Sequence, residues 1–524
     1  KMVELLSDNK RFSVRKNQFI YLEESFNRKL KSLFDEGKIA EETYKAVRST
    51  GSVPARLYGL PKVHKSRQNP PLRPILSMPK AYCTNLALWL DKFLKRYLPD
   101  NNTVKDSFDF VNTIKEVRNS NLFMVSYDVK SLFTNIPLDR TISHILNIIP
   151  DNELPTSRAT FQVFLEMACK DIVFSFDNVL YRQKDGMAMG SNLGPTMAGF
   201  AMDMVERTFA HVPFLYKRYV DDVFALFNNK EAADNFLVQI NNVDENIKFT
   251  MEAEQQGMLT FLDVTVHKRN NTFETSWHLK STNTGLYTNK NSHSPQSYKA
   301  SAIRSLVYRA HKICSNFTLF NEAFKKIQNI FIRNGYNYKF IAKIRDKLLN
   351  FNTQSVENMP KPNQIFWKMP YIQEVDHKAK TVVKRLNNIL RLKDYRILLA
   401  YSTKKTSAFF PNKDKIPDAL TSNTVYQYQC DLCEGHTYTG ESIRHWDTRK
   451  SEHMSGKPNP TEISMHRHRL RDSNFTIVLK TKHTKIGEAL INKTVPPDLR
   501  LNAHEPPFHL KLFNYNTHRA SFNE

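Results

Sequence analysis

Helical and strand-like patterns of apolar residues alternate along the chain and predict a mixed α+β fold. Residues 1–50 and 81–118 have the helical pattern. Between them prolines interrupt any helix, and short apolar runs at residues 55–65 and 71–77 predict the two strands of a hairpin. Residues 295–350 are helical again, with Lys, Arg and His on their polar faces.

Two further strands carry carboxylates at their ends. Residues 121–133 predict a strand that ends in Asp128, and residues 214–227 place Asp221 and Asp222 between two runs of strand-forming residues, as at the tip of a tight hairpin. Adjacent like charges repel, and a divalent cation removes the repulsion; hard carboxylate oxygens suit Mg²⁺. The alternatives are a helix N-cap for Asp128 and a solvated turn for the pair.

Strands at residues 247–252 and 259–266 are expected to complete the sheet that carries these acids. Asp263, within the second strand, is either a fourth catalytic acid or a structural residue, and we favour the structural role. Residues 351–421 mix Pro, Asn and Lys with one helix near residues 376–393, and we interpret them as a connecting segment that also carries charge.

The length and charge of the chain indicate several domains and a polyanionic partner. A chain of 524 residues is too long for one core, so two to four domains are expected. The formal charge of +24 makes nucleic acid the first candidate partner. A membrane partner is not expected, because no basic amphipathic helix and no apolar run of spanning length are found. Five cysteines, an odd number, suit a reducing compartment. Because Lys1 falls within a helical pattern, we also expect sequence upstream.

Basic side chains lie on the predicted hairpin at residues 55–77. Lys62, Lys65 and Arg73 could hold a triphosphate, since Arg offers a two-pronged grip and Lys a point charge. The alternative is a generic basic surface hairpin.

The acids themselves, an aromatic residue and a Gly-rich loop together suggest a nucleotide site. Asp128 and Asp221 could hold two metal ions about 3.5–4 Å apart. Phe133 follows Asp128 by five residues and could pack under the sugar of an incoming nucleotide. Residues 186–202 form a Gly-rich loop, including Gly190, whose small residues let a backbone approach a base pair closely. Tight helix packing would explain the same glycines.

In their order, these features resemble the right-handed palm of reverse transcriptases. The similarity covers residues 55–310. Within it, four motifs resemble those of Penelope-like retroelements in particular. These motifs lie at residues 56–65, 72–75, 126–137 and 259–263. The resemblance implies that Asp128 and Asp221 bind two Mg²⁺ ions, with Asp222 alongside. It also implies that Phe133 is the steric gate that favours deoxynucleotides. Penelope-like enzymes are similar to telomerase reverse transcriptase, which leaves a telomerase-like function open.

The helices at residues 295–350 then take the role of a thumb that tracks the template–primer backbone, in preference to a solvated helix face. The residues that would make these contacts are Lys299, Arg304, Arg309, His311, Lys312, Lys325 and Lys326.

A possible zinc site appears in the last hundred residues. Cys430 and Cys433 form a CxxC pair, which is a half-site for Zn²⁺. His466 is our first choice for a further ligand, with His436 and His468 behind it. Two reduced cysteines without a metal are the alternative.

Residues of the same region suffice for phosphodiester hydrolysis. Tyr426 or His453 can help to activate water, Arg449 can stabilise charge on the phosphate, and Glu488 can hold one Mg²⁺ ion. Tyr438 is the second tyrosine of the set. Arg449 and His453 are four residues apart on a predicted polar helix and therefore share one face.

Together these residues resemble a GIY-YIG endonuclease over residues 422–505. Tyr426 ends the first family motif and Tyr438 begins the second, while Asn502 matches a later family position. The departures are Thr424 in place of Gly and Thr439 in place of Ile, and neither removes a reacting group. Cysteines between the two tyrosine motifs are similar to those of Penelope-like nucleases.

These interpretations predict a right-hand polymerase with fingers, palm and thumb, followed by a small α/β nuclease domain. The expected parts are N-terminal helices and fingers at 1–120, palm at 121–294, helical thumb at 295–395, linker at 396–421 and GIY-YIG endonuclease with a zinc site at 422–524.

The expected function is target-primed reverse transcription by a retrotransposon enzyme that nicks its target DNA. Its partners would be the element RNA, target DNA and dNTPs, and it would act in the nucleus after synthesis in the cytoplasm. Two alternatives remain: a telomerase-like or domesticated polymerase with an idle nuclease, and a non-catalytic RNA-binding protein. The sequence leaves the oligomeric state open.

Overall fold

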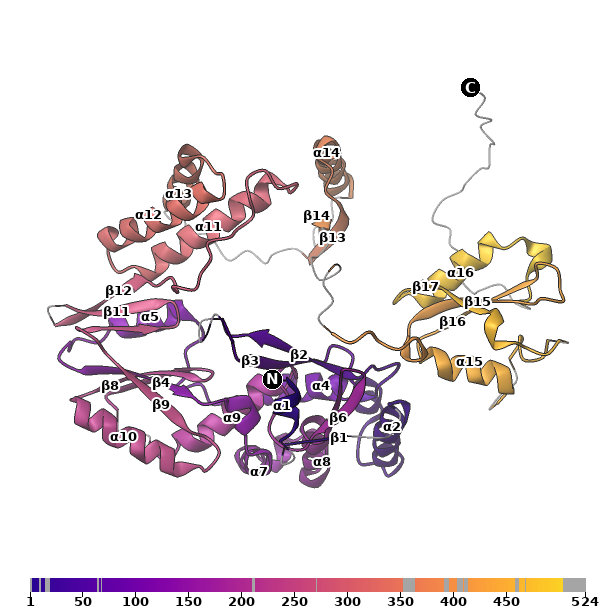
Figure 1. Ribbon diagram of the computed structural model, residues 1–524, viewed down its shortest axis with the longest axis horizontal. Helices are drawn as coiled ribbons and strands as arrows, with labels where there is room; N and C mark the ends of the chain where they lie inside the picture. Colours follow the sequence, from indigo (N-terminus) through magenta and orange to yellow (C-terminus); the bar gives the residue numbers. More distant parts are fainter. Residues whose placement is uncertain are drawn as a thin grey trace.

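In the computed structural model a two-sheet body carries a helical unit, a small βαβ unit and a separate C-terminal domain (Figure 1). The structure describes residues 2–8, 11–14, 19–63, 66, 68–209, 213–269, 271–351, 363–390, 395–402, 409, 413–457, 461–466 and 468–502. No helix of this described part is long and apolar enough to span a membrane.

The palm sheet lies between two hydrophobic cores. Its four antiparallel strands have the order β7-β8-β4-β9, with the bounds β7 Leu215–Tyr219, β8 Asp222–Phe227, β4 Phe123–Val129 and β9 Phe249–Ala253. Successive side chains of a strand point to opposite faces, so Val125 and Tyr127 enter one core and Met124 enters the other. The predicted strand before Asp128 and the predicted hairpin at residues 214–227 are confirmed.

Helices cover the first face of the palm sheet. The bounds of the helices in this part of the chain are α5 Ser107–Lys115, α6 Leu132–Asn135, α7 Leu138–Ile148, α8 Arg158–Cys169, α9 Gly194–Glu206 and α10 Lys230–Val243. Their apolar residues share the core that includes Tyr127, whereas α5 packs on the other face. The Tyr127 hydroxyl donates a hydrogen bond to the Ala233 carbonyl of α10, 3.1 Å away, which fixes this helix on the sheet.

The fingers sheet contains the predicted basic hairpin. Its five strands have the order β1-β6-β5-β2-β3, with the bounds β1 Phe12–Val14, β6 Val179–Gln183, β5 Ile172–Phe176, β2 Ala55–Pro61 and β3 Leu72–Ser77. The nearby helices are α1 Met2–Leu6, α2 Ile20–Asp35, α3 Glu41–Val47 and α4 Thr84–Leu94. The hairpin of β2 and β3 is confirmed, whereas β1 lies in a region predicted to be mostly helical.

The expectation that residues 259–266 complete the palm sheet is wrong. Leu262 has a positive φ of 58°, and the turn there folds the chain back on itself. The two halves pair with each other in a separate sheet of order β10-β11-β12, with the bounds β10 Met258–Phe261, β11 Val264–Arg269 and β12 Thr272–Trp277. Only the earlier predicted strand, as β9, joins the palm.

Three helices follow this sheet and pack on it through the second core. Their bounds are α11 Gln296–Ile313, α12 Phe317–Arg333 and α13 Tyr338–Phe351. Arg309 of α11 forms an ion pair with Asp263 and also donates to the Ser107 hydroxyl, 3.2 Å away. Asp263 therefore joins α11 to α5 and the β10–β11 turn, which is the structural role that we favoured for it.

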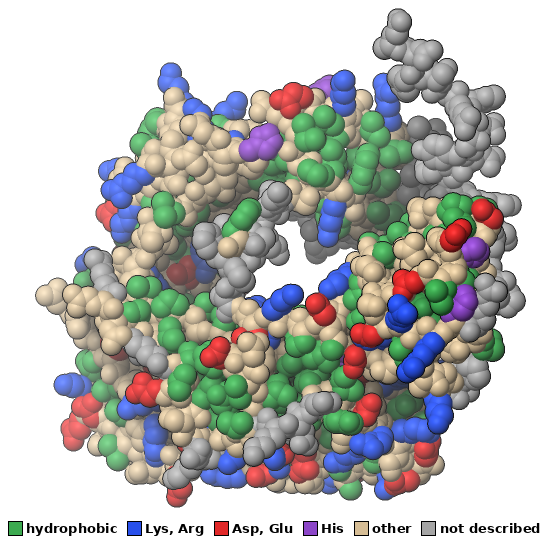
Figure 2. Space-filling model, turned by 45° about the vertical axis from the view of Figure 1, so that its right-hand side comes forward, with side chains coloured by type: hydrophobic (Ala, Val, Ile, Leu, Met, Phe, Trp, Pro, Cys, Tyr) green, Lys and Arg blue, Asp and Glu red, His purple; other side chains and the backbone are tan. Residues whose placement is uncertain are grey.

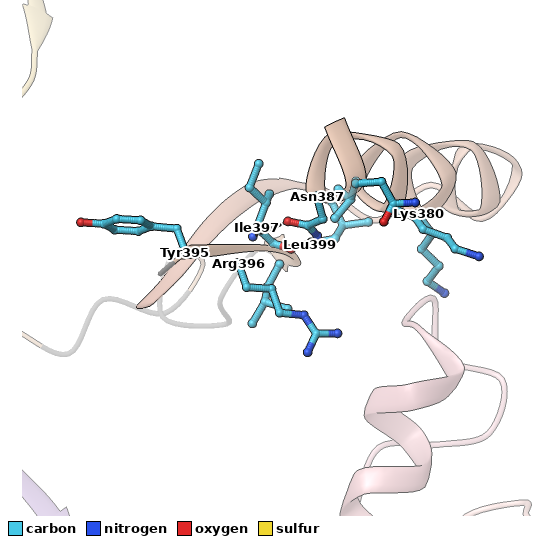
Figure 3. Close-up of a pocket in the computed structure, with 10 residues that line it drawn as sticks. Lys380, Asn387, Tyr395, Arg396, Ile397 and Leu399 are labelled. Atoms are coloured by element: carbon cyan, nitrogen blue, oxygen red, sulfur yellow. Dashed lines mark hydrogen bonds between the residues drawn. The ribbon is translucent and has the colours of Figure 1, made fainter. Parts of the chain in front are cut away.

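Residues 363–402 form a βαβ unit where an irregular connection with one helix was expected. The strands β13 Asn363–Pro370 and β14 Tyr395–Ser402 pair in parallel, and α14 Gln373–Leu390 supplies the crossover that parallel pairing requires. The Asn387 side chain binds both backbone groups of Ile397 and so ties α14 to β14 beside a small pocket (Figure 3). Almost every residue of β13 is exposed, so no buried face produced a strand signal in the sequence.

The C-terminal domain is a three-stranded antiparallel sheet with two helices. The strand order is β16-β15-β17, with the bounds β15 Thr424–Gln429, β16 Thr437–Ser442, β17 Phe475–Lys480, α15 Trp446–Ser455 and α16 Thr484–Thr494. The predicted strand at residues 423–430, the polar helix and the helical setting of Glu488 are confirmed.

This domain docks on the fingers through a buried polar junction. The Glu23 carboxylate of α2 accepts hydrogen bonds from the backbone N–H groups of Gly51 and Ser52, at 3.0 and 2.6 Å. The Gly51 carbonyl accepts from the Ser422 hydroxyl at 2.9 Å, and the Ser52 carbonyl accepts from His445 Nε2 at 2.6 Å. Because a Cβ on Gly51 would lie 2.5 Å from the Ser422 Cβ, only glycine permits this approach.

We predict that Asp263→Asn lowers the free energy of unfolding by about 1–3 kcal/mol, because it removes a charged partner of Arg309. Burial raises the pKa of Asp263, but hydrogen bonds from Arg309 and Ser107 and the Arg309 charge bring it below its ordinary value. The contribution is thus complete above about pH 4 and is lost as the pH falls through the lowered pKa. Urea denaturation at pH 7 measures the loss.

The control is Asp139→Asn, since this side chain is 85% exposed and its ion pair with Lys170 is solvated. An Asp263→Asn loss no larger than that of the control would contradict the structural role of Asp263.

Candidate functional site

Three carboxylates meet at one end of the palm sheet. Asp128 of β4 is the direct cross-strand partner of Asp222 of β8, so their side chains project from the same face. Asp221 precedes β8 in the hairpin turn, and its carbonyl accepts a hydrogen bond from the Val129 N–H at 3.2 Å. The structure therefore brings together Asp128, Asp221 and Asp222, and Asp128 lies within the strand rather than at a helix N-cap.

The charges of this group interact. Partial loss of hydration and the nearby charges of Asp221 and Asp128 raise the pKa of Asp222 to about 6, while Lys280 opposes the shift. Asp128 and Asp222 are both exposed at the surface of the sheet, so a cation can reach them. Hard carboxylate oxygens around a site of concentrated negative charge fit Mg²⁺, which would remove the repulsion.

A buried ion pair supports the hairpin that carries Asp221. Arg218 of β7 pairs with Glu206 of α9, and both side chains are more than nine-tenths buried. The same guanidinium donates to the Val220 carbonyl at 3.2 Å, immediately before Asp221. Val220 has a φ of 57°, which is unfavourable for a β-branched residue, so this hydrogen bond helps to hold a strained turn. The sequence analysis missed both Arg218 and Glu206.

The Gly-rich loop packs beneath Phe133. The Met187 N–H donates to the Phe133 carbonyl at 2.7 Å, and a Cβ on Gly194 would lie 3.3 Å from the Phe133 ring. Gly190 has a φ of 124°, and a Cβ there would meet the Leu76 carbonyl of β3 at 2.0 Å. Close packing accounts for the glycines, and it joins the fingers sheet to the turn that follows Asp128. Nucleotide contacts by Gly190 and Phe133 stay a prediction.

The predicted phosphate-binding residues are on the fingers hairpin. Arg73 lies exposed on β3 opposite Leu60, and the Lys62 N–H donates to the Pro71 carbonyl at 2.8 Å where the hairpin continues beyond β2. Lys65 lies outside the described residues.

A second set of side chains gathers in the C-terminal domain. The Tyr426 hydroxyl lies 2.6 Å from His453 Nε2, and Arg449 Nε donates to the same hydroxyl at 3.2 Å. His453 Nδ1 lies 2.8 Å from the Thr461 hydroxyl. The Tyr438 ring lies 5.7 Å from the His453 ring between centroids. Four of the five predicted residues therefore form one connected group.

Burial sets the protonation of this second site. Burial and the Arg449 charge lower the pKa of His453 to about 4, so the imidazole is neutral at pH 7 and has a ring nitrogen free to accept a hydrogen bond. Burial raises the pKa of Tyr426 well above its ordinary value and that of Tyr438 to about 12. The two phenols therefore remain protonated as hydrogen-bond donors.

Glu488 of α16 completes the group. Burial and the negative charges of Glu441 and Glu462 raise its pKa to about 7, although Arg449 opposes the shift. A carboxylate among other carboxylates fits a divalent cation. Glu441 follows Gly440 directly, and its Oε2 atom is buried without a hydrogen-bond partner in the described part of the chain. The sequence analysis did not single out Glu441.

The two departures from the GIY-YIG pattern have different settings. The Thr439 backbone is held by Asn502, whose side chain binds its N–H at 2.9 Å and its carbonyl at 2.7 Å. Thr424 is fully buried, and its hydroxyl has no partner among the described residues. Gly440 retains the close contact expected of a glycine, because a Cβ there would lie 2.6 Å from the Tyr426 hydroxyl oxygen.

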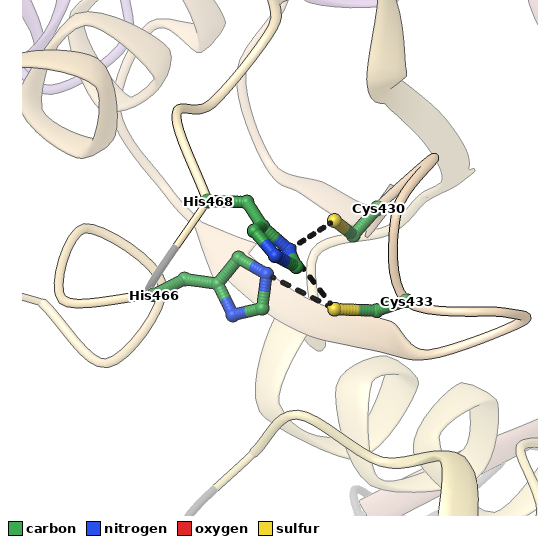
Figure 4. A group of neighbouring side chains, drawn as sticks. All are labelled: Cys430, Cys433, His466 and His468. Atoms are coloured by element: carbon green, nitrogen blue, oxygen red, sulfur yellow. Dashed lines mark hydrogen bonds between the residues drawn. The ribbon is translucent and has the colours of Figure 1, made fainter.

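A Cys₂His₂ group lies at the edge of this domain (Figure 4). The ligand atoms of Cys430, Cys433, His466 and His468 all lie within 4.8 Å of one another. Cys433 Sγ is 3.6 Å from His466 Nε2 and 3.2 Å from His468 Nδ1. Sulfur and nitrogen ligands of a tetrahedral zinc lie about 3.5 Å apart, so the group fits Zn²⁺.

The choice of His466 beside the two cysteines agrees with this geometry, and His468 would supply the fourth ligand. His436 does not belong to the group; its Nδ1 instead lies 3.1 Å from the Cys433 carbonyl.

Cys433→Ser is predicted to reduce the zinc content from one ion per chain to none, because a hydroxyl replaces a thiolate ligand. Metal analysis of the purified protein measures it. The control Cys314→Ser, a free cysteine outside the group, keeps one zinc. Equal zinc contents in the two variants would contradict the site.

Arg218→Lys should lower the free energy of unfolding by about 1–3 kcal/mol, because lysine cannot contact both Glu206 and the Val220 carbonyl as the guanidinium does. Thermal and urea denaturation measure it. Arg207→Lys is the control, since Arg207 is 55% exposed and pairs with Asp203. Unchanged stability of Arg218→Lys would show that the buried pair does not hold the hairpin.

Comparison with known protein families covers the palm and the helices that follow it. Residues 63–263 match the family model described as reverse transcriptase (RNA-dependent DNA polymerase), and this region includes Asp128, Asp221 and Asp222. Residues 286–346, which include α11 and α12 and most of α13, match the model described as animal helix-turn-helix domain. No curated protein matches the sequence.

Among solved structures, the chain is similar to three structures of telomerase from two Candida species. Apo telomerase from Candida tropicalis truncated from its C-terminal domain has 14% identity and a TM-score of 0.34, over 44% of this chain and 56% of that chain. Candida albicans telomerase in complex with a TWJ fragment of telomeric RNA has 12% identity and a TM-score of 0.41, over 68% and 70%. Apo telomerase from Candida tropicalis has 13% identity and a TM-score of 0.35, over 66% of each chain.

The similarity thus spans about half the length of the first of these structures. At this level it does not distinguish one kind of reverse transcriptase from another, and the family match carries the assignment. The chain contains a reverse transcriptase domain, which supports RNA-directed DNA polymerase activity.

Proposed function

We propose that this chain is a retroelement enzyme of the Penelope-like kind, which nicks target DNA and extends the exposed 3′ hydroxyl by copying RNA. The observation that carries the proposal is the meeting of Asp128, Asp221 and Asp222 at the end of β4 and β8, within the region that matches reverse transcriptases. The cross-strand pairing of two acids costs repulsion that a bound cation would remove, which argues for a catalytic site and against a passive binding surface.

The palm residues each have a distinct part in the proposed polymerisation. Asp128 and Asp221 would hold the metal ions, and Arg218 would keep the hairpin in position. When bound, two Mg²⁺ ions would lower the pKa of the primer 3′ hydroxyl and stabilise the leaving pyrophosphate. Phe133, fixed against Gly194, would set the space beside the nucleotide sugar.

The helices α11–α13 and an opening, which lies at the centre of the space-filling view (Figure 2), offer a path for the template and primer. Lys and Arg side chains lie on the rim of this opening (Figure 2). Contacts with the phosphate backbone would give binding without sequence preference and with a strong dependence on salt. The match of these helices to a helix-turn-helix family supports a nucleic-acid contact there.

The C-terminal site supports the nuclease part of the proposal. Neutral His453 would accept a hydrogen bond from Tyr426, and this pair would orient and polarise the attacking water. Arg449 would stabilise the developing charge on the phosphate, and Glu488 would hold one Mg²⁺. The Cys₂His₂ group would brace the edge of the same domain through Zn²⁺.

A telomerase-like enzyme that extends existing 3′ ends with an idle nuclease is the second candidate; the buried Thr424 hydroxyl, which lies close to the nuclease site and has no partner among the described residues, is the observation that favours it. Supercoiled plasmid with Mg²⁺ separates the two, because the absence of a nicked product would favour this candidate. Primer extension with labelled dTTP on a poly(rA) template tests the third interpretation, a non-catalytic RNA-binding protein.

Asp221→Ala is expected to reduce DNA synthesis at least 100-fold and to leave plasmid nicking intact, whereas Arg449→Ala should do the reverse. Primer extension on an RNA template and nicking of supercoiled plasmid measure the two activities. Loss of both activities in either variant would argue against two separate sites.

The most informative product comes from plasmid, RNA and dNTPs incubated together with the unmodified protein. DNA joined covalently to cDNA would support priming by the nick itself. Nicked plasmid and free cDNA without any joined product would count against target-primed synthesis.

A further inference from the structure

A basic pocket lies where the fingers meet the C-terminal domain. It has a volume of about 880 Å³ and is formed by the fingers, the segment at residues 413–423 and the end of β17. Six of its lining residues are basic: Arg56, Lys80, Lys413, Lys415, Lys480 and Lys482. Only two acids, Asp414 and Asp418, line it with them, so the pocket carries a net charge of +4 from these side chains, six positive minus two negative.

The acids neutralise little of this charge. Lys415 Nζ lies 4.0 Å from the Asp418 carboxylate, and both side chains are exposed. Asp414 engages Arg56 only through its backbone carbonyl, at 3.0 Å, and its carboxylate accepts instead from the Asn178 N–H at 3.4 Å. The positive charge of the pocket is therefore mostly available to a ligand.

Two lysines from different domains line the pocket. Lys80 belongs to the fingers and Lys482 to the C-terminal domain; both are exposed, and neither side chain has an ion pair or hydrogen bond within the described ranges. The Arg56 Nε atom is buried without a hydrogen-bond partner in the same described set. Basic groups without protein partners on two walls suit a ligand with several phosphates in a row.

The position of the pocket connects it to both sites. Lys413 Nζ lies 3.1 Å from the Ser77 hydroxyl, next to Leu76, whose backbone packs against the Gly-rich loop beneath Phe133. On the other wall, Lys480 of β17 pairs with Thr424, two residues before Tyr426. Lys482 lies two residues before Thr484, the first residue of α16, and this helix carries Glu488.

The buried junction gives this pocket a fixed shape. Ser422 lines the pocket and also donates to the Gly51 carbonyl, while His445 binds the Ser52 carbonyl beside it. Since these groups are buried at both partners, the two walls are held together rather than tethered by a loose linker.

We propose that this pocket binds the phosphodiester backbone of a single DNA strand that runs from the C-terminal site toward the palm. The inference rests on the proposed function, because that function requires a nicked strand to reach the polymerase site. Lys80 and Lys482 contact neighbouring phosphates from the two domains, and the strand is held by charge without regard to its sequence.

The test measures binding of a fluorescent 20-nucleotide single-stranded DNA to the full chain by anisotropy across a range of salt concentrations, without Mg²⁺ or dNTPs. The double variant Lys80→Gln and Lys482→Gln should bind more weakly, and the slope of log K against log salt should become shallower by about 1.4, the value for two lost phosphate contacts on a single strand.

The matched control replaces Lys105 and Lys230, two exposed lysines on the palm side of the molecule, with Gln. It should keep the original slope. A slope that is unchanged in the pocket variant, or changed equally in the control, would overturn the proposal. An RNA of the same sequence forms the second arm, and a loss confined to RNA would overturn the assignment to DNA.

Because this assay needs neither activity, its outcome is separate from that of the proposed function. A protein that neither nicks nor copies would refute the proposed function, while the salt slope would still decide whether the pocket binds DNA.

Discussion

Repulsion among carboxylates at the end of two neighbouring strands is the constraint on which the rest of the structure depends. Asp128 and Asp222 are cross-strand partners, and Asp221 stands beside them in a turn with a strained Val220. Without a cation this arrangement is unfavourable: burial and, after it, the charges of Asp221 and Asp128 raise the pKa of Asp222. The fold therefore has to impose it.

The surrounding elements impose it from two sides. Two buried cores hold β4 between them, so the strand that carries Asp128 cannot shift its register without exposing Val125 or Met124. Arg218 and Glu206 hold the turn that carries Asp221, at the expense of burying two charges. The second site follows a similar principle, since buried Tyr426 and His453 meet beside an acidic group that includes Glu488. Each site concentrates charge that a metal would neutralise.

Local patterns in the sequence were enough to predict much of this arrangement. The hairpin at Asp221 and the strand at Asp128 depend on short runs of strand-forming residues, which tertiary context did not override. The Arg218–Glu206 pair was not predictable, because two charges in a sequence suggest solvent rather than mutual burial. The strands β13 and β14 were missed because neither has a fully buried face to produce an alternating pattern: β13 is almost wholly exposed and β14 is half-buried. The separate sheet of β10–β12 depends on one turn at Leu262 that the apolar run concealed.

The most direct measurement is anomalous scattering from Mn²⁺ in crystals of the protein with an RNA template, a DNA primer and a non-hydrolysable nucleotide. The account predicts two peaks about 3.5–4 Å apart between the carboxylates of Asp128 and Asp221. Peaks absent from this end of the palm sheet, or bound by only one of these two residues, would contradict it.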